Sequence, residues 1–466
     1  MSSPQASRLG PSRILAYCLP AIPIAALSLP LSVFIPPLYA EHTTLSLNLI
    51  GTLFFVTRIF DVFTDPAFGF YSDRTRPRIG RRRFWMAASL PVLMISIWML
   101  FNPPAEAGWL YLTFWLTAVY LGYTMSFISH LSWGAELSGL YDDRSRVLGW
   151  RQLAVNGGML TVLVLPALLS LDGDSVERAS AMGLYIVLAL PLTFGVAFLT
   201  VPDPTPTRPA PLSPIRESLT ALAHDPHLRR LLAAEFCLAS ALAITGSLYV
   251  WFAEDVWQLP DNTSLILLTY FGAAVISMPL WVRLAERAEK HRAFSFALFY
   301  GATTLALYLI VPSNSLIGAM AGSFLYGLAF GAGIFLARAM LADIADADAL
   351  EHGTPRMGIY FSTLTLTAKV GGAMGPFIAY NILGWAGYDP NAAVTPSGQA
   401  WLMATFIVPP ALFLLAGGLI ARKHKLTRAV HDEIRQQLEA RDGADTSSVT
   451  DHEPAIDGDR HAGDIA

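Results

Sequence analysis

The chain has 466 residues, of which 54% are hydrophobic and only 14% are charged, and its mean hydropathy is +0.47. Because roughly a quarter of the residues in a soluble domain are charged, this composition excludes a soluble globular protein and indicates an integral membrane protein. The formal net charge of −4 excludes nothing further, since acids gather in the C-terminal tail and arginines in the loops. We expect contacts with membrane lipid and none with nucleic acid.

Apolar stretches long enough to cross a bilayer, about 20 residues each, recur along almost the whole chain. Prolines inside them do not exclude helices, because neighbouring helices satisfy the freed backbone groups. A membrane β-barrel would show short alternating segments instead. We therefore predict an all-α integral membrane protein with twelve transmembrane helices, at about 13–38, 47–70, 84–102, 109–136, 153–171, 179–201, 230–252, 263–284, 293–312, 314–341, 357–383 and 399–421.

The first span follows Arg8 and Arg13, and it is longer and richer in proline than the apolar core of a signal peptide. We expect it to remain as the first helix. Cys18 and Cys237 both fall inside spans, one in each half of the chain. They predict neither a disulfide framework nor a metal site, and small apolar packing residues are the simpler interpretation.

The second span carries three charged residues, Arg58, Asp61 and Asp65, on one helical face. Each ionised group at the bilayer centre costs about 2.5–3.5 kcal/mol unless it is paired. Pairing Arg58 with Asp61 leaves Asp65 without a cation. Hard oxygen ligands suit Na⁺ and a carboxylate suits H⁺, so Asp61 and Asp65, with Thr64 and Thr124 nearby, are candidates to bind a small cation. The alternative is a buried ion-pair network that only fixes helix packing.

Charged residues near the ends of spans have two interpretations. Glu136 ends the fourth span and Arg151 precedes the fifth, while Arg338 and Asp343 lie near the end of the tenth. Such residues either pair to lock one state of an alternating-access cycle or contact a ligand. We therefore regard Glu136, Arg338 and Asp343 as candidate gating residues.

Other polar and aromatic residues inside spans favour a structural interpretation. For His130 and Glu235 a satisfied hydrogen bond in the core is favoured over a proton relay. Aromatic residues in membrane helices mostly pack or lie at the interface, although they also line pockets for sugars or amphiphiles. The aromatic candidates of this kind are Tyr123, Trp133, Trp150 and Tyr326.

A proline-rich polar stretch follows the sixth span, where a linker between two six-helix bundles would lie. The loops of the two halves echo each other weakly, which is the parallel-repeat plan of major facilitator transporters, with the substrate site between the halves. Within the linker, "SPIRESLTALAHD" predicts a short surface helix. The predicted domains are an N-terminal bundle at 1–201, a cytoplasmic linker at 202–229, a C-terminal bundle at 230–421 and a largely disordered cytoplasmic tail at 422–466.

Lys369 is one of only four lysines and the only one in the middle of a span. It either neutralises Asp61 or Asp65 across the bundle, or it binds an anionic or hydroxylated substrate. A lysine inside a membrane is a functional candidate by default.

Basic residues are concentrated in the loops that follow even-numbered spans, with Arg178 as the exception. By the positive-inside rule, both termini are expected in the cytoplasm. The basic residues on that side are Arg74, Arg76, Arg78, Arg81, Arg82, Arg83, Arg144, Arg146, Arg151, Arg229, Arg230, Arg287, Lys290, Arg292 and Arg356.

Three separated segments resemble a known family. "TRIFDVFTDPAFGFYSDRTRPRIGRRRFW", "GAELSGLYDDRSRVLGWRQ" and "MLADIADADALEHGTPRMGIYFSTLTLTAKVGGAMG" together look like the melibiose permease-like family of glycoside–pentoside–hexuronide:cation symporters. The resemblance implies the major facilitator fold and cation-coupled solute import in a bacterial inner (plasma) membrane. By position, it implies that Asp61 and Asp65, with Thr64 and Thr124 beside them, hold the coupling cation, that Arg58 is the family's helix-two arginine, and that Arg151 and Lys369 lie at or near the substrate and cation sites.

The sugar-binding positions of that family differ in this chain. Where melibiose permease places two aspartates and tryptophans, the residues here are Ala25, Phe127, Leu131 and about Ile334. Loss of two acids removes acceptors for sugar hydroxyls, so a galactoside is disfavoured. A less polar glycoside, another hydroxylated metabolite or an amphiphile such as a lysolipid remain alternatives, with Tyr123 and Phe127 as candidate substrate contacts.

We therefore expect a monomeric secondary active transporter, with no cofactor, that moves a small sugar-like solute with Na⁺ or H⁺. An ATP-driven pump is disfavoured because the chain has no G-x-x-x-x-G-K-[ST] loop. A membrane-embedded enzyme, with Asp61 and Asp65 as an acid pair and His130 as a base, is disfavoured by the symmetry of the two halves. A receptor or scaffold that binds a partner through its tail is the third alternative.

Overall fold

The computed structural model describes residues 10–75, 77–137, 141–169, 171, 174–202, 225–352 and 357–424, together with 430, 432–434, 436 and 437. Within those residues, all regular secondary structure is helical. The elements are α1 (Pro11–Cys18), α2 (Ala21–Val33), α3 (Ile35–His42), α4 (Leu47–Arg74), α5 (Arg81–Phe101), α6 (Trp109–Glu136), α7 (Tyr141–Leu169), α8 (Ser175–Thr200), α10 (Pro226–Trp251), the π-helical turn η1 (Phe252–Val256), the 3₁₀ turn η2 (Pro260–Asn262), α11 (Thr263–Ala288), α12 (Lys290–Ala306), the 3₁₀ turn η3 (Leu307–Ile310), α13 (Leu316–His352), α14 (Met357–Trp385) and α15 (Pro396–Arg422).

The first predicted span is three consecutive helices instead of one. Helix α1 ends just before Pro20, and α3 begins with Pro36 and Pro37 in its first turn. Proline has no amide hydrogen and clashes with the carbonyl one turn earlier, so it interrupts a helix interior but fits a first turn. Pro20, Pro36 and Pro37 therefore lie where this span divides, whereas Pro30 stays inside α2.

Several helices extend beyond their predicted spans. Helix α7 begins at Tyr141 instead of 153, and α13 ends at His352 instead of 341. Hydropathy marks only the apolar part of a helix, so polar end turns such as "YDDRSRV" are invisible to it. The predicted surface helix of the linker and most of the tail lie outside the described residues.

Eleven described segments are long and apolar enough to cross a membrane. The remaining predicted span corresponds to α14, which has 29 residues but does not meet that apolar criterion. Lys369, together with the glycines and threonines around it, lowers the hydropathy of α14. The predicted span that fails this criterion is therefore the one that carries a lysine at its centre.

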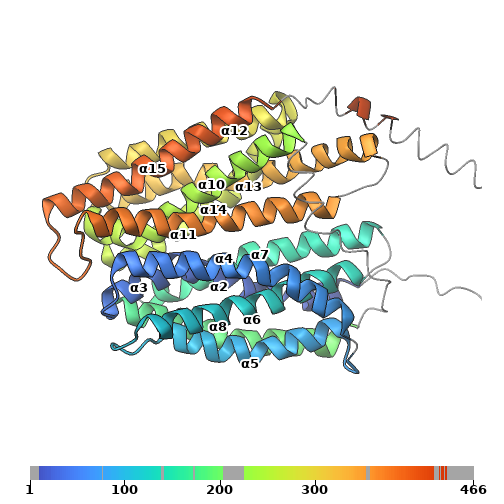
Figure 1. The fold of residues 1–466 in the computed structure, drawn as a ribbon, viewed down its shortest axis with the longest axis horizontal. Coiled ribbons are helices and arrows are strands. Elements are labelled where there is room, and N and C mark those ends of the chain that lie inside the picture. The colour runs from blue at the N-terminus through green and yellow to red at the C-terminus, as the bar shows by residue number, and fades with distance from the viewer. Residues whose placement is uncertain are drawn as a thin grey trace, which may run out of the picture.

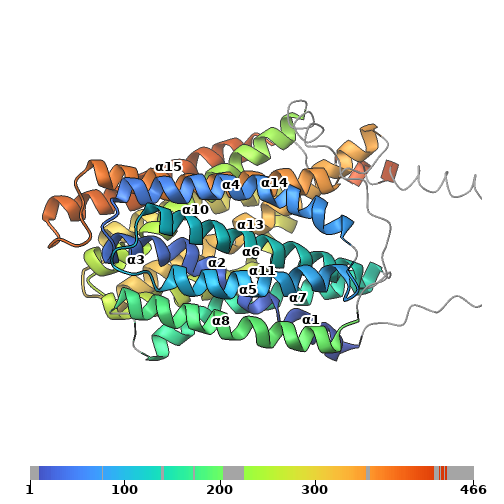
Figure 2. The same cartoon turned by 60° about the horizontal axis from the view of Figure 1, so that its bottom comes forward.

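The helices form two bundles that lie one above the other in Figure 1. In one bundle α5 packs on α6 and α8, and α2 packs on α7; in the other α10 packs on α14 and α15, and α11 on α13. The bundles meet mainly where α4 packs on α14, α7 on α11 and α2 on α10, and α3 also packs on α10. Figure 2 shows α4 and α14 side by side as they are in Figure 1.

The molecule has two distinct ends. At the linker end α8 finishes and α10 begins, and at the opposite end, the loop end, lie α3 and the turn between α14 and α15 (Figure 1). Helices α4 and α14 run antiparallel and approach closely near the loop end. A Cβ added to Gly384 would lie 2.0 Å from Asn48 Oδ1, and Asn48 Nδ2 donates to Asn381 Oδ1 at 2.9 Å. The absence of a side chain at Gly384 thus lets the bundles touch.

Candidate functional site

The charged residues of α4 meet Lys369 of α14 at the boundary between the bundles. Lys369 Nζ donates to Asp61 Oδ2 at 2.7 Å and also to Asp65 Oδ2. Arg58 Nη1 lies 3.2 Å from the same oxygen of Asp61. We call Arg58, Asp61, Asp65 and Lys369 the central tetrad. The structure thereby brings Lys369 into contact with Asp61, which lies 308 positions away along the chain.

Thr124 of α6 completes the surroundings of the two carboxylates. Its hydroxyl bridges them, with Oγ1 3.0 Å from Asp61 Oδ1 and 2.7 Å from Asp65 Oδ1. Thr64 instead donates its hydroxyl to the backbone carbonyl of Asp61 at 3.0 Å. Of the two predicted threonines, Thr124 therefore contacts both acids, and Thr64 contacts the helix backbone.

The central tetrad balances two carboxylates against two cationic side chains. Asp61 is only 1% exposed, whereas the side chain of Asp65 is 27% exposed. Because ionised groups are costly in lipid, the exposed part of Asp65 indicates water-accessible space between the bundles instead of a lipid contact. Lys369 thus supplies the second positive charge that two carboxylates require in addition to Arg58. Its ammonium lies between the two carboxylates, a position that also suits a small cation.

A row of aromatic rings on α6 runs from the central tetrad toward α7. The Arg58 guanidinium lies over the Tyr120 ring at 4.9 Å. One turn further, Tyr123 stacks on Phe127, with ring centroids 5.6 Å apart, and the Arg151 guanidinium lies 5.2 Å from the Phe127 ring. The candidate substrate contacts Tyr123, Phe127 and Arg151 are therefore neighbours, and they adjoin the acids.

His130 anchors Arg151 on the inner side of α7. Arg151 Nε donates to His130 Nδ1 at 3.2 Å, and His130 Nε2 lies 2.7 Å from the Tyr17 carbonyl oxygen. Since arginine only donates and a carbonyl only accepts, Nδ1 must be unprotonated and Nε2 must carry the hydrogen. His130 is therefore a neutral imidazole with both nitrogens bonded, as expected for a satisfied core residue. Glu235, by contrast, is buried with no described hydrogen-bond partner for Oε2.

The candidate gating residues do not assemble into one site in the described part of the chain. Asp343 accepts two hydrogen bonds from Lys290 Nζ, at 2.7 and 2.8 Å, within the same bundle. Arg338 is exposed, and Arg151 lies deep on His130 instead of at a loop end. The side chain of Glu136 lies outside the description. Gating by Glu136, Arg338 and Asp343 stays a prediction.

Sequence reasoning missed a second charged contact between the bundles, at the loop end. Arg178 Nη1 lies 3.2 Å from Glu254 Oε1 and 3.1 Å from Thr263 Oγ1, both in the other bundle. Trp251 Nε1 donates to Glu41 Oε1 at 2.7 Å, again between bundles. The signal available in the sequence was Arg178, the one basic residue that departed from the charge bias of the loops.

We call Glu41, Arg178, Glu254 and Asp255 the loop-end latch. Arg178 is 1% exposed, and Asp255 accepts a hydrogen bond from the Tyr388 hydroxyl. Burial raises the pKa of Glu41 above its ordinary value, despite the hydrogen bond from Trp251 and the nearby guanidinium of Arg178. The latch joins the two bundles at the loop end.

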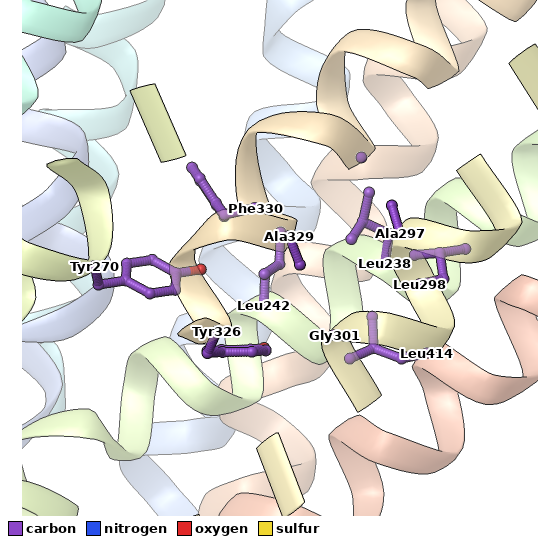
Figure 3. A pocket seen from close by; sticks show the side chains of 11 residues that line it. Leu238, Leu242, Tyr270, Ala297, Leu298, Gly301, Tyr326, Ala329, Phe330 and Leu414 are labelled. Atoms are coloured by element: carbon purple, nitrogen blue, oxygen red, sulfur yellow. The ribbon is translucent and has the colours of Figure 1, made fainter. Parts of the chain in front are cut away.

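A small apolar hollow lies inside the second bundle (Figure 3). Tyr270 and Tyr326 approach it from α11 and α13, and leucines of α10, α12 and α15 cover the remaining sides. None of the central tetrad lines it. We interpret the hollow as a packing space within one bundle, because a substrate site served by both bundles would lie at their boundary.

Comparison with known proteins gives consistent matches over most of the chain. A profile described as "MFS/sugar transport protein" matches residues 16–428. The chain is 24% identical over 408 residues to the inner membrane symporter YicJ of Escherichia coli strain K12, covering 86% of this chain and 88% of that protein. It is 23% identical over 436 residues to the glucuronide carrier protein homolog of the same strain, covering 90% and 93%.

Solved structures show the same arrangement of helices. The nucleoside transporter NupG superposes with a TM-score of 0.65 at 13% identity. The match covers 89% of this chain and 100% of the NupG chain. At such low identity the likeness concerns the fold alone. It confirms the predicted all-α transporter fold with two bundles.

Proposed function

This chain belongs to the MFS/sugar transport protein family, and from that premise we propose that it moves a small sugar-like solute across a membrane by symport with Na⁺ or H⁺. Membership confirms the resemblance to glycoside–pentoside–hexuronide:cation symporters and places the chain among transporters and not enzymes. The observation that carries the proposed coupling is the ammonium of Lys369, held by Asp61 and Asp65 of the other bundle.

In the proposed mechanism, the coupling cation and Lys369 compete for the same two carboxylates. Na⁺ would take oxygens from Asp61, Asp65 and Thr124, whereas H⁺ would protonate one carboxylate. Either event weakens the hold of the acids on Lys369, which belongs to the opposite bundle. Cation binding thereby changes the relative stability of the states in which the bundles touch, which is the thermodynamic requirement for coupling.

The proposed orientation places the linker end in the cytoplasm, with both chain termini, in accordance with the positive-inside rule. The loop-end latch then closes the pathway to the outside. We keep the domain boundaries 1–201, 202–229, 230–421 and 422–466, a bacterial inner membrane and a monomeric carrier as parts of the same proposal. Alternating access requires the latch to open when the central site is offered to the outside.

The proposed solute is a glycoside or a related hydroxylated compound. The aromatic surface of Tyr123 and Phe127 suits the apolar face of a sugar ring, and Arg151 supplies hydrogen-bond donors beside it. Ala25 and Phe127 offer no carboxylate at positions where melibiose permease has aspartates. The relative named as a glucuronide carrier supports a sugar derivative as the first class to test.

The test uses purified protein in nanodiscs, screened for thermal stabilisation by glycosides, sugar acids and lysolipids with and without Na⁺ and at two pH values. We compare the wild type with Asp61→Asn and with Glu106→Gln, which removes the same charge from an exposed loop position. Ligand stabilisation that depends on Na⁺ or pH and disappears only in Asp61→Asn supports the proposal. Cation dependence that survives in Asp61→Asn contradicts the assigned coupling site.

A further inference from the structure

We propose that His424 is a proton sensor at the linker end: as a neutral ring packed on His227 and His291 it holds the end of α15 on the second bundle, and when protonated it releases that end. The proposal goes beyond solute transport, because it concerns a proton site separate from the central tetrad. The observations that carry it are the contacts among the three rings, their burial and the place of His424 just after α15.

Three histidines from three helix ends meet at the linker end of the second bundle, which comprises α10 to α15. His227 lies in the first turn of α10, His291 is the second residue of α12, and His424 follows the end of α15 by two residues. The ring centroids of His227 and His424 lie 4.9 Å apart, and those of His291 and His424 lie 6.1 Å apart. His424 is therefore the ring that joins the other two.

The cluster is buried in a way that suits uncharged rings. His424 is 4% exposed and His291 is 7% exposed. Nδ1 of each is buried and has no described hydrogen-bond partner. A protonated imidazole carries a hydrogen on both nitrogens, so here its Nδ1–H would have no acceptor. Burial, together with the nearby His227, His291 and Arg230, lowers the pKa of His424 to about 3.

The charges around the cluster do not favour a proton on His424 either. The carboxylate of Asp225 caps α10, and that of Asp343 is paired with Lys290. No described carboxylate forms a salt bridge with His424, whereas Arg230 repels a positive charge there. The titratable and charged groups near the three rings are Asp225 and Arg230 of α10, Glu289, Lys290 and Arg292 at the start of α12, Asp343 of α13, and Arg422 and Lys423 at the end of α15.

His424 ends the packing of α15 on its neighbours. Helix α15 packs on α10 and α12, and the three lie together in Figure 1. Ser295 Oγ of α12 donates to the Gly418 carbonyl at 2.8 Å, and the His424 amide donates to the Ala421 carbonyl at 3.1 Å, which closes the last turn. The predicted tail, 422–466, begins at this turn. Release of His424 would therefore free the point from which the tail continues.

The difference in pKa between the packed and the hydrated ring sets the direction of the switch. A hydrated imidazole has a pKa of about 6.5, so the released end binds a proton more tightly than the packed end. Packing is fully stabilised above about pH 6.5 and is lost as the pH falls toward the lower pKa of packed His424. Each pH unit below about 6.5 favours release by about 10-fold. In the proposed orientation the sensor responds to acidification of the cytoplasm.

A proton fits this cluster better than a metal ion. Within the described part of the chain, no group of three or more histidine, cysteine, aspartate or glutamate side chains is arranged to hold a metal ion. The ring of His424 instead packs edge-on against that of His227, with an interplanar angle of 81°. Such packing is favourable for neutral rings, and a positive charge on either ring weakens it because both rings lie beside Arg230 and His291.

The experiment measures hydrogen–deuterium exchange of the backbone amides at the end of α15, residues 416–424, in nanodiscs without solute. Exchange is compared at about pH 7.5 and about pH 5.5, after correction for the intrinsic effect of pH on exchange. We expect the protection of these amides to fall by about 10-fold at the lower pH, because one further proton is bound on release. The amides of residues 396–402, at the other end of α15, should keep their protection and show that the protein stays folded.

Substitutions at His424 separate titration from packing. His424→Phe keeps a ring and His424→Gln keeps a neutral polar side chain, and neither binds a proton in this pH range. In either variant, protection at the end of α15 should change by less than about 2-fold between the two pH values. His424→Arg carries a permanent charge and should lower the protection at both. His42→Phe, at the loop end, is the matched control for loss of a histidine and should keep the full response.

Three results would overturn the inference. These are equal protection of the wild type at the two pH values, a response that persists in both His424→Phe and His424→Gln, and a loss of protection when EDTA is added at the higher pH, which would identify a metal site. Failure of the proposed transport function is distinguishable from each of them. The exchange experiment needs neither solute nor Na⁺, and Asp61→Asn should keep the response of α15.

Discussion

The central tetrad and the loop-end latch both join the bundles through charged side chains, but their composition differs. The tetrad contains two acids and two bases, and part of Asp65 is exposed. The latch contains three acids and one arginine, and that arginine is 1% exposed. Besides the Arg178–Glu254 pair, the latch has hydrogen bonds that involve neutral side chains, from Trp251 to Glu41 and from Arg178 to Thr263.

This difference separates two tasks. In the tetrad, the ammonium of Lys369 occupies a position that another cation is able to take, so the contact is suited to exchange. In the latch, the fixed hydrogen bonds of Arg178 and Trp251 are suited to closing the loop end in one state. We therefore expect changes in the tetrad to alter cation binding, and changes in the latch to alter which state is populated.

The largest effect is expected from Lys369→Ala, which removes the competitor for Asp61 and Asp65. At an effective dielectric constant of about 20, a unit charge at this distance changes the interaction energy enough for cation affinity to rise by about 10-fold or more. Gradient-driven accumulation should fall by about 100-fold, because the cation is no longer linked to the opposite bundle. Cation binding by calorimetry and uptake into proteoliposomes measure the two effects.

Lys290→Ala is the matched control for Lys369→Ala. Lys290 lies in the same half of the chain, and its side chain is 40% exposed and paired with Asp343 within one bundle. The Lys290→Ala substitution should leave cation affinity unchanged. If Lys369→Ala lowered cation affinity instead, the competition between lysine and cation would be wrong, and Lys369 would be part of the cation site in another way.

The next largest effect is expected from Arg178→Gln, which leaves three acids of the latch without their arginine. Breaking a buried pair is unfavourable by about 3–5 kcal/mol, so the closed loop end should lose most of its population. Spin labels at Ala105→Cys and Val394→Cys, both exposed and in different bundles, should move apart when measured by double electron–electron resonance. Cation affinity should stay within about 3-fold of the wild type.

A second substitution tests whether charge causes the opening. Glu254→Gln in the Arg178→Gln background removes one of the uncompensated acids and should restore part of the closed population. Arg13→Gln, exposed and distant in the chain, should leave the label distance unchanged. An unchanged distance in Arg178→Gln itself would show that the latch does not control closure.

How much of the fold and of the candidate site the sequence could predict depends on how far apart in the chain the interacting residues lie. The charges of α4 were recognisable because burial of each one is unfavourable wherever its partner lies. Lys369 was a reasonable partner, since the chain has only four lysines and this one stands mid-span. The functional roles of all these residues stay predictions.

Other features depend on long-range geometry that no local pattern encodes. Arg178 meets Glu254 across 76 positions, so an arginine in the wrong loop gave the only hint of the latch. The hydrogen bond from Arg151 to His130 was also hidden, because it depends on how α6 and α7 pack. The division of the first span depended on which prolines fall in a helix interior and which in a first turn.

A smaller effect is expected from Thr124→Val, which sharpens the description of the tetrad. The hydroxyl contacts both acids, and a hydrogen bond to a charged group contributes about 1.5–3 kcal/mol. Na⁺ affinity should fall by about 10-fold, whereas H⁺ coupling should change less because a proton needs no further oxygen ligand. Thr64→Val, which loses only a bond to the backbone, is the control. Equal losses in both variants would contradict the proposed role of Thr124.

The smallest effect is expected from a change of pH on the closure of the loop-end latch. Burial in the closed latch raises the pKa of Glu41, so the closed state binds a proton more tightly than an open state in which Glu41 is hydrated. The stabilisation of closure is therefore present below the pKa of the hydrated carboxyl and is lost as the pH rises through the higher pKa of the closed latch. Acidification should bring the same pair of spin labels closer together. Glu41→Gln should abolish that response and Glu106→Gln should keep it, whereas a response that persists in Glu41→Gln would transfer the proton site to Glu254 or Asp255, the two remaining acids of the latch.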